Sequence, residues 1–218
     1  DLLKRVLAWS LPVQMERQFA LRIAELCAYQ DETYARTYLD FVEEVMRAER
    51  ALDREHSALT QAVGVGLYKL MAYKDEYEVA RLATKKSNVE RIKSLFDGDI
   101  ELSYRLQPPT LRWLFKRKIA VGGWFYYVLC ALKRGKKLRG GAWDPFAHTT
   151  ARRLERGLVK WYRDGLGTAL ECLREDNYPL VLEWAKLPDA IRGYEGVKER
   201  SAEIQRQKAE QLLATICS

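Results

Sequence analysis

The stretch that decides the fold is MERQFALRIAELCAYQDETYARTYLDFVEEVM, which runs from Met15 to Met46. Its large apolar residues recur at steps of three and four, the spacing that places side chains on one face of an α-helix. Acidic and basic residues occupy much of the other face. The stretch therefore predicts amphipathic helices with an apolar stripe made of Met15, Phe19, Ile23, Leu26, Tyr34, Tyr38, Phe41, Val45 and Met46.

Helical spacing continues through most of the chain. One stripe holds Leu59, Val63, Leu67 and Leu70, and nearby glycines leave room for a neighbouring backbone. Further helices are predicted at 77–96, 111–119 and 124–133, from Thr149 or Thr150 onward, and at 197–216. The predicted fold class is mainly α, a multi-helix bundle-like domain with at most one or two short strands. We divide it into an N-terminal helical half, 1–98, and a C-terminal helical half with a basic loop, 99–218.

Three segments depart from an ordinary surface helix. Residues 99–107 alternate apolar and polar side chains, which is typical of a strand, but no second strand is evident. The longest apolar run, Trp124 to Leu132, is too short to span a bilayer, so we expect a buried helix there. The helix at 197–216 is so polar that we expect it to lie in solvent or against an absent partner.

Charge is distributed unevenly along the chain. The net charge is +7, yet between Arg105 and Arg163 fifteen basic residues face only Asp144 and Glu155, a local balance of +13. The remainder carries 22 basic and 28 acidic residues, a balance of −6, and residues 31–60 are the most acidic part. A concentrated positive field attracts nucleic acid, an acidic protein or a phosphorylated ligand. An acidic helix of the same fold could also neutralise it.

The cysteines and the chain start bear on the cellular compartment. Four cysteines, Cys27, Cys130, Cys172 and Cys217, are scattered without the close spacing of a zinc or iron–sulfur site. We expect them to be reduced and buried, in a cytoplasmic protein. No signal peptide is evident near Asp1, which we interpret as the start of a piece of a longer chain.

Motifs for a self-contained active site are missing. There is no glycine-rich phosphate loop and no serine in a nucleophile-elbow setting. The two histidines, His56 and His148, have no metal-ligating neighbour at helical spacing. We therefore predict no catalytic, cofactor-binding or metal-binding residue in this chain.

Charged clusters are the alternative candidates. In YKDEYEVAR, Asp75 is placed to cap a helix ahead of ion pairs. Around Gly193 and Gly196, basic residues flank a tight connection that could bind an anion or fix an interhelical angle, and we favour the structural role. Residues 135–141 form a basic loop. The candidate interaction residues are Lys74, Asp75, Glu76, Arg81, Lys136, Lys137, Arg139, Arg192 and Lys198.

Three strings in these regions resemble one family. They are KLMAYKDEYEVARL (69–82), DPFAHTTARRLERGLV (144–159) and LPDAIRGYEGVKE (187–199), with AYQDETYARTY (28–38) as an earlier part. In this order they resemble the C-terminal region of the fused indolepyruvate ferredoxin oxidoreductases, in the thiamine-diphosphate-dependent 2-oxoacid oxidoreductase superfamily.

The resemblance implies a role inside a larger enzyme. Members of the family oxidatively decarboxylate an aryl 2-oxoacid to an acyl-CoA and pass electrons through iron–sulfur clusters to ferredoxin. The Gly-Asp-Gly motif for thiamine diphosphate and magnesium and the cluster-binding cysteine motifs are absent from this chain. The resemblance thus implies an accessory domain that contacts other domains of the oxidoreductase or an acidic electron acceptor such as ferredoxin.

Two other functions remain open from the residues alone. Basic residues interleaved with Trp113, Phe115, Trp124, Tyr126 and Trp143 have the composition of a nucleic-acid-binding module, although the aromatics also suit a core. The same basic region could dock the phosphates of CoA.

Overall fold

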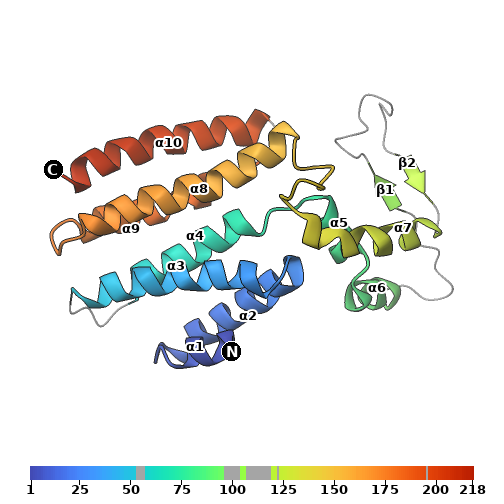
Figure 1. Cartoon of the computed structure of the whole chain (residues 1–218), viewed down its shortest axis with the longest axis horizontal. Helices are drawn as coiled ribbons and strands as arrows, with labels where there is room; N and C mark the ends of the chain where they lie inside the picture. Colours follow the sequence, from blue (N-terminus) through green and yellow to red (C-terminus); the bar gives the residue numbers. More distant parts are fainter. Residues whose placement is uncertain (53–56, 96–103, 107–118, 122, 195) are drawn as a thin grey trace. The chain divides into compact units, whose positions relative to one another are not determined.

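The fold is mainly α-helical, as predicted (Figure 1). A computed structural model of the chain describes residues 1–52, 57–95, 104–106, 119–121, 123–194 and 196–218. Its elements are α1 (Leu2–Leu7), α2 (Val13–Tyr29), α3 (Glu32–Arg50), α4 (Ala58–Met71), α5 (Glu76–Ala83), α6 (Lys86–Lys93), β1 (Tyr104–Leu106), β2 (Ile119–Val121), α7 (Phe125–Leu132), the 3-10 helix η2 (Lys133–Leu138), α8 (Thr150–Glu171), α9 (Tyr178–Ala185), the 3-10 helix η3 (Leu187–Ala190) and α10 (Gly196–Ile216).

The chain forms two compact units. The large unit comprises Asp1–Ala72 and Arg153–Ser218, and the small unit comprises Tyr73–Arg152. This division differs from the two sequence halves, 1–98 and 99–218, because the chain leaves the large unit after α4 and returns to it within α8.

The large unit is built around the stretch that opens at Met15. Phe19, Ile23 and Leu26 of α2 and Tyr38 of α3 are buried, so the predicted stripes do form the core. Helix α4 approaches them closely: a Cβ at Gly64 would collide with the Phe19 ring, and the Tyr38 hydroxyl donates to the Gly64 carbonyl at 2.9 Å. Gly64 is therefore a packing residue, as expected of the glycines beside this stripe.

A buried carboxylate connects three helices of the large unit. Glu49, at 2% exposure near the end of α3, accepts hydrogen bonds from the backbone N–H groups of Leu59 and Thr60 at 2.8 and 2.9 Å. The Thr60 and Tyr178 hydroxyls each donate to the same carboxylate at 2.6 Å. Glu49 thereby satisfies N–H groups at the start of α4 that have no partner within their own helix.

Helix α10 is not the solvated helix that its polarity suggested. Ala202, Ala209 and Ile216 are buried, and the Trp184 indole of α9 donates to the Ala209 carbonyl at 3.2 Å. The small alanine side chains permit close packing without a wide apolar stripe. The polar composition of the helix therefore hid the narrow face that it buries.

The prediction that the four cysteines are reduced and buried was wrong: one pair is oxidised, and none of the four is fully buried. Cys172 and Cys217 form a disulfide with a Cα–Cα distance of 5.3 Å, whereas Cys27 and Cys130 form no disulfide and are half-buried. Asn177 lies beside the disulfide and donates to the carbonyls of Cys172 and Ile216, at 2.7 and 2.9 Å. The two cysteines are 45 residues apart, and only the packing of α10 brings them together.

The small unit contains a short β-hairpin-like pair that the sequence revealed only in part. Strand β1 pairs antiparallel with β2, with Tyr104 opposite Val121 and Leu106 opposite Ile119. Residues 104–106 of the strand predicted at 99–107 thus find a partner inside the chain, and the rest of that prediction lies outside the described residues. The helix expected at 111–119 lies outside the described residues except for Ile119, which belongs to β2.

Two helix predictions in the small unit need correction. The helix expected from Tyr77 to Phe96 is two helices, α5 and α6, because the chain turns at Thr84, and Phe96 lies outside the described residues. The run expected to be a buried helix is helical, but in α7 Leu129 is buried while Tyr127 is 75% exposed. Within the described parts of both units, no helix has the length and apolar character needed to cross a bilayer.

Candidate functional site

Asp75 begins the candidate site by capping α5, as its position in the sequence predicted. Its backbone is extended, with φ −92° and ψ −176°, and its carboxylate accepts a hydrogen bond from the Glu78 N–H at 2.8 Å. A short acidic side chain at this position satisfies a free N–H and interacts favourably with the helix dipole. The local sequence therefore sets where α5 starts.

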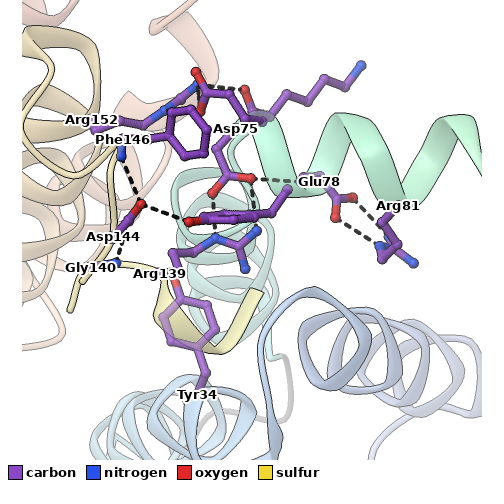
Figure 2. A network of polar contacts seen from close by, with 12 residues as sticks. Tyr34, Asp75, Glu78, Arg81, Arg139, Gly140, Asp144, Phe146 and Arg152 are labelled. Atoms are coloured by element: carbon purple, nitrogen blue, oxygen red, sulfur yellow. Dashed lines mark hydrogen bonds and ion pairs between the residues drawn. The ribbon is translucent and has the colours of Figure 1, made fainter. Parts of the chain in front are cut away.

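Arg139 meets this cap from the basic loop (Figure 2). The guanidinium donates through Nη2 to Asp75 Oδ1 at 2.8 Å and through Nε to Oδ2. Only 4% of the Arg139 side chain and 3% of the Asp75 side chain are exposed. Removing one partner of such a buried pair leaves an uncompensated charge, which costs about 3–5 kcal/mol.

Tyr77 and Asp144 form a second layer of the network. The Tyr77 hydroxyl donates to Asp144 Oδ1 at 3.0 Å, and the Arg139 guanidinium lies 5.5 Å from the centre of the Tyr77 ring. Asp144 also accepts from the backbone N–H groups of Gly140 and Phe146, at 2.8 and 3.0 Å. Burial, followed by the hydrogen bond to Asp144, raises the pKa of the Tyr77 hydroxyl above its ordinary value.

Gly135 shows how tightly the basic loop fits against α5. A Cβ at this position would lie 2.8 Å from a Tyr77 ring carbon, so a larger residue would displace either the ring or η2. The basic loop therefore packs closely against α5 within the small unit.

Ion pairs surround the buried network. Arg152 pairs with Glu76 at 3.2 Å and lies 5.6 Å from the Tyr73 ring centre, and Arg81 pairs with Glu78 at 2.8 Å. Thr149 accepts from the Arg152 N–H at 3.4 Å and so caps α8, which confirms that part of the prediction. The Arg152–Glu76 pair joins the first turn of α8 to α5, whereas the Arg81–Glu78 pair lies within α5.

Of the other basic candidates in this unit, Lys74 joins the network through its backbone, because its carbonyl accepts from Arg152 Nη2 at 3.4 Å. Lys74 and Lys137 are exposed, and Lys136 is half-buried in η2. The structure brings Asp75 and Arg139 together, and Lys136 and Lys137 belong to η2, which precedes Arg139. The exposed ammonium of Lys137 is available to a partner as surface charge.

The second predicted cluster lies in the large unit. Lys198 donates to both carboxylate oxygens of Glu155, at 2.7 and 2.8 Å, and Arg192 Nε donates to the Asp189 carbonyl at 2.9 Å. Gly193 has φ +96°, a conformation that favours glycine, and it permits the turn into α10. The structural role that we favoured for this cluster fits these contacts.

Lys69 belongs to the same cluster, although the sequence did not identify it. Its ammonium donates to the Pro188 and Asp189 carbonyls at 2.8 and 3.1 Å. Burial lowers the pKa of Lys69, and the positive charges of Arg192 and Lys198 act in the same direction. Because Lys69 is about 120 positions from its partners, no local pattern could have identified it.

A groove of about 550 Å³ runs between α3 and α8 in the large unit. Arg163 lies 5.3 Å from the Phe41 ring centre, and Lys160 pairs with Asp164 at 2.5 Å. Three acidic and three basic side chains line the groove, so it presents no net charge of one sign to a ligand. Its charged members are Glu44, Arg156, Lys160, Arg163, Asp164 and Glu171.

The comparison with known families covers both clusters. A model of DUF6537, described as a family of unknown function, matches residues 15–211. The chain belongs to this family. No curated protein and no solved structure matches it. Among the described residues of this DUF6537 chain, no group of three or more histidine, cysteine or acidic side chains is arranged to hold a metal ion.

The three strings quoted above touch one another in the DUF6537 fold. Within the small unit, Tyr77 of the first string contacts Asp144 of the second. Within the large unit, Lys69 of the first contacts Pro188 of the third, and Glu155 of the second contacts Lys198 of the third. The strings therefore contain some of the polar contacts that join distant parts of the chain.

Proposed function

We propose that this DUF6537 chain is an accessory, non-catalytic domain of an indolepyruvate-type 2-oxoacid:ferredoxin oxidoreductase, where it serves assembly or partner docking. In this proposal the thiamine diphosphate, magnesium and iron–sulfur clusters are held by other domains of the enzyme. The partner is another domain of the oxidoreductase or an acidic electron acceptor such as ferredoxin.

The mutual contacts of the three strings carry the proposal. Segments centred on residues 75, 150 and 193 resemble the oxidoreductase family in order, and each contacts another through a charged or hydroxyl side chain. The resemblance therefore concerns residues that build the domain, which is what membership of a domain family requires.

The distribution of basic side chains supports a docking role. Arg139 and Arg152 are used internally, in pairs with Asp75 and Glu76. Arg134 and Lys137 are exposed in η2, in a stretch whose charge is predominantly positive. A positive surface accelerates encounter with an acidic partner and makes the encounter sensitive to salt.

Affinity purification from the native organism tests the proposal. With a tag on the native protein that contains this chain, we expect the eluate to contain thiamine diphosphate. We also expect it to oxidise indolepyruvate in the presence of CoA and an electron acceptor. An eluate without cofactor or activity, from an extract that retains both, would overturn the proposal.

The cytoplasmic location belongs to the same proposal. Disulfides are rare in that compartment, so the Cys172–Cys217 bond is the feature that argues against it. Acid-quenched thiol labelling in whole cells decides between the two: reduced Cys172 and Cys217 support the cytoplasm, and an oxidised pair contradicts it.

A further inference from the structure

We propose that the outer face of α7 and η2 is a docking surface for an acidic protein segment that carries apolar side chains. We call this face the α7 stripe and define it by Trp124, Tyr127, Val128, Ala131, Arg134 and Lys137. The inference rests on the proposed docking function and specifies both the surface and the chemistry of its partner.

Exposed apolar side chains follow one another along the stripe at helical spacing. Trp124, Tyr127 and Val128 are 64%, 75% and 42% exposed, and Ala131 is exposed one turn further along. Steps of three and four residues place them on one face of the helix. The opposite face already buries Leu129. Helix α7 is therefore apolar on both sides, whereas a surface helix normally presents polar residues to water.

Basic residues continue the same line beyond α7. Arg134 follows Ala131 by three positions, and Lys137 follows Arg134 by three within η2. Side chains three apart are eclipsed in a 3-10 helix, so the two cations extend the stripe in one direction. Residues 123–143 contain five basic residues and no acidic one. Among these five, Arg139 is buried in its pair with Asp75. A complementary partner carries carboxylates at this end.

The surface is held in place before any partner arrives. Helix α7 and η2 both pack on α5. Gly135 fits against the Tyr77 ring, and the Arg139–Asp75 pair anchors the end of the loop. Binding to a fixed surface avoids the entropy cost of ordering its side chains and backbone.

A protein segment fits the stripe better than the other anionic partners. Tryptophan, tyrosine and arginine are the residues that contribute most at protein interfaces. Val128 and Ala131 have no flat face on which a nucleic-acid base could stack, and that stacking is what single-strand binding relies on. The eight residues of α7 extend about 12 Å, which is short for a helix lying along a membrane. The same length provides far less than the roughly 800 Å² per partner of a stable dimer.

Binding of a labelled glutamate–tyrosine copolymer to the full chain tests the inference, with polyglutamate as the probe of charge alone. We expect the copolymer to bind at least about tenfold more tightly than polyglutamate, since one apolar anchor contributes about 1.4 kcal/mol or more. The double variant W124A/Y127A should lose this preference while retaining its polyglutamate affinity. The double variant R134E/K137E should weaken binding of both polymers.

Control variants and competing probes make the result decisive. Leu21 and Tyr194 are exposed in the large unit, at 58% and 79%, so L21A/Y194A should bind as the unmutated chain does. Equal copolymer affinity of W124A/Y127A and the unmutated chain would overturn the inference. Stripe-dependent binding to phosphatidylserine vesicles or to oligo-dT that is tighter than copolymer binding would also overturn it.

The test separates this inference from the proposed function. Stripe-dependent copolymer binding by a chain that purifies without an oxidoreductase would refute the proposed function alone. Co-purification with the oxidoreductase, together with a copolymer affinity that W124A/Y127A leaves unchanged, would refute the role of the α7 stripe alone.

Discussion

Each unit of the molecule contains a buried carboxylate at the start of a helix, but the two are stabilised differently. In the large unit, Glu49 receives its hydrogen bonds from backbone N–H groups and from the Thr60 and Tyr178 hydroxyls, which are all neutral donors. In the small unit, Asp75 accepts from the Glu78 N–H and from the Arg139 guanidinium. The large unit thus buries a charge among dipoles, and the small unit buries a charge pair.

The difference follows from how much apolar surface each unit buries. The described part of the large unit has an extensive core, whereas in the small unit the described buried apolar residues are Tyr73, Tyr77, Ala80, Leu129 and Ala147. With few apolar contacts, the small unit depends on its polar network for a fixed geometry. Equivalent caps therefore contribute differently according to the core around them.

The largest expected effect is the loss of the Asp75–Arg139 pair. We expect D75A to destabilise the small unit by about 3–5 kcal/mol, because Arg139 remains buried without a counter-charge. The double variant D75A/R139M should recover part of that loss. Urea unfolding combined with hydrogen exchange of small-unit amides measures both. A cost below about 1 kcal/mol, as for an exposed pair, would show that the pair does not hold this unit.

A smaller effect is expected at Glu49. The substitution E49Q keeps one acceptor oxygen but turns an amide N–H₂ toward groups that donate to Glu49. We therefore expect the free energy of unfolding to fall by about 1–3 kcal/mol, because some of these donors lose their acceptor. E44Q is the matched control because Glu44 is exposed on the same helix, and it should leave the unfolding midpoint unchanged. If E49Q destabilised the chain as strongly as D75A, the contrast between the two carboxylates would fail.

The smallest effects concern pH, and they have opposite directions in the two units. Hydrogen bonding from Arg5 lowers the pKa of Glu43, so its contribution to stability is present above about pH 4.5 and is lost as the pH falls through the lower folded value. The raised pKa of Tyr77 makes its contribution full below about pH 10 and lost as the pH rises further. We expect E43Q to flatten the acid limb of the stability–pH curve and Y77F the alkaline limb. Each variant should leave the other limb in place.

Local features of the site were predictable from sequence, but its long-range partners were not. Asp75 caps a helix three residues away, and that relation is visible in the residues themselves. Arg139 lies 64 positions from Asp75, and Cys217 lies 45 from Cys172, so only the folded chain brings them together. Hydrophobic periodicity correctly predicted the mainly α fold class.

The exposure of individual helices was the other property that could not be predicted from the sequence. The apolar run of α7 was expected in a core because apolar residues usually are buried. Periodicity cannot distinguish a helix with two apolar faces from a fully buried one, and the structure exposes Trp124 and Tyr127. The polar helix α10 is the converse case, since it packs through Ala202 and Ala209. In both helices the neighbours, rather than the composition, determine burial.

The most direct test of the docking function is the rate of electron delivery to an acidic acceptor across a salt series. In the complete enzyme we expect K136E/K137E to slow this rate by about tenfold at low ionic strength, with a weaker salt dependence. K4E/K86E, which changes the net charge equally at exposed positions outside the loop, should retain the unmutated rate. Identical kinetics for both double variants at every salt concentration would contradict a docking role for the basic loop.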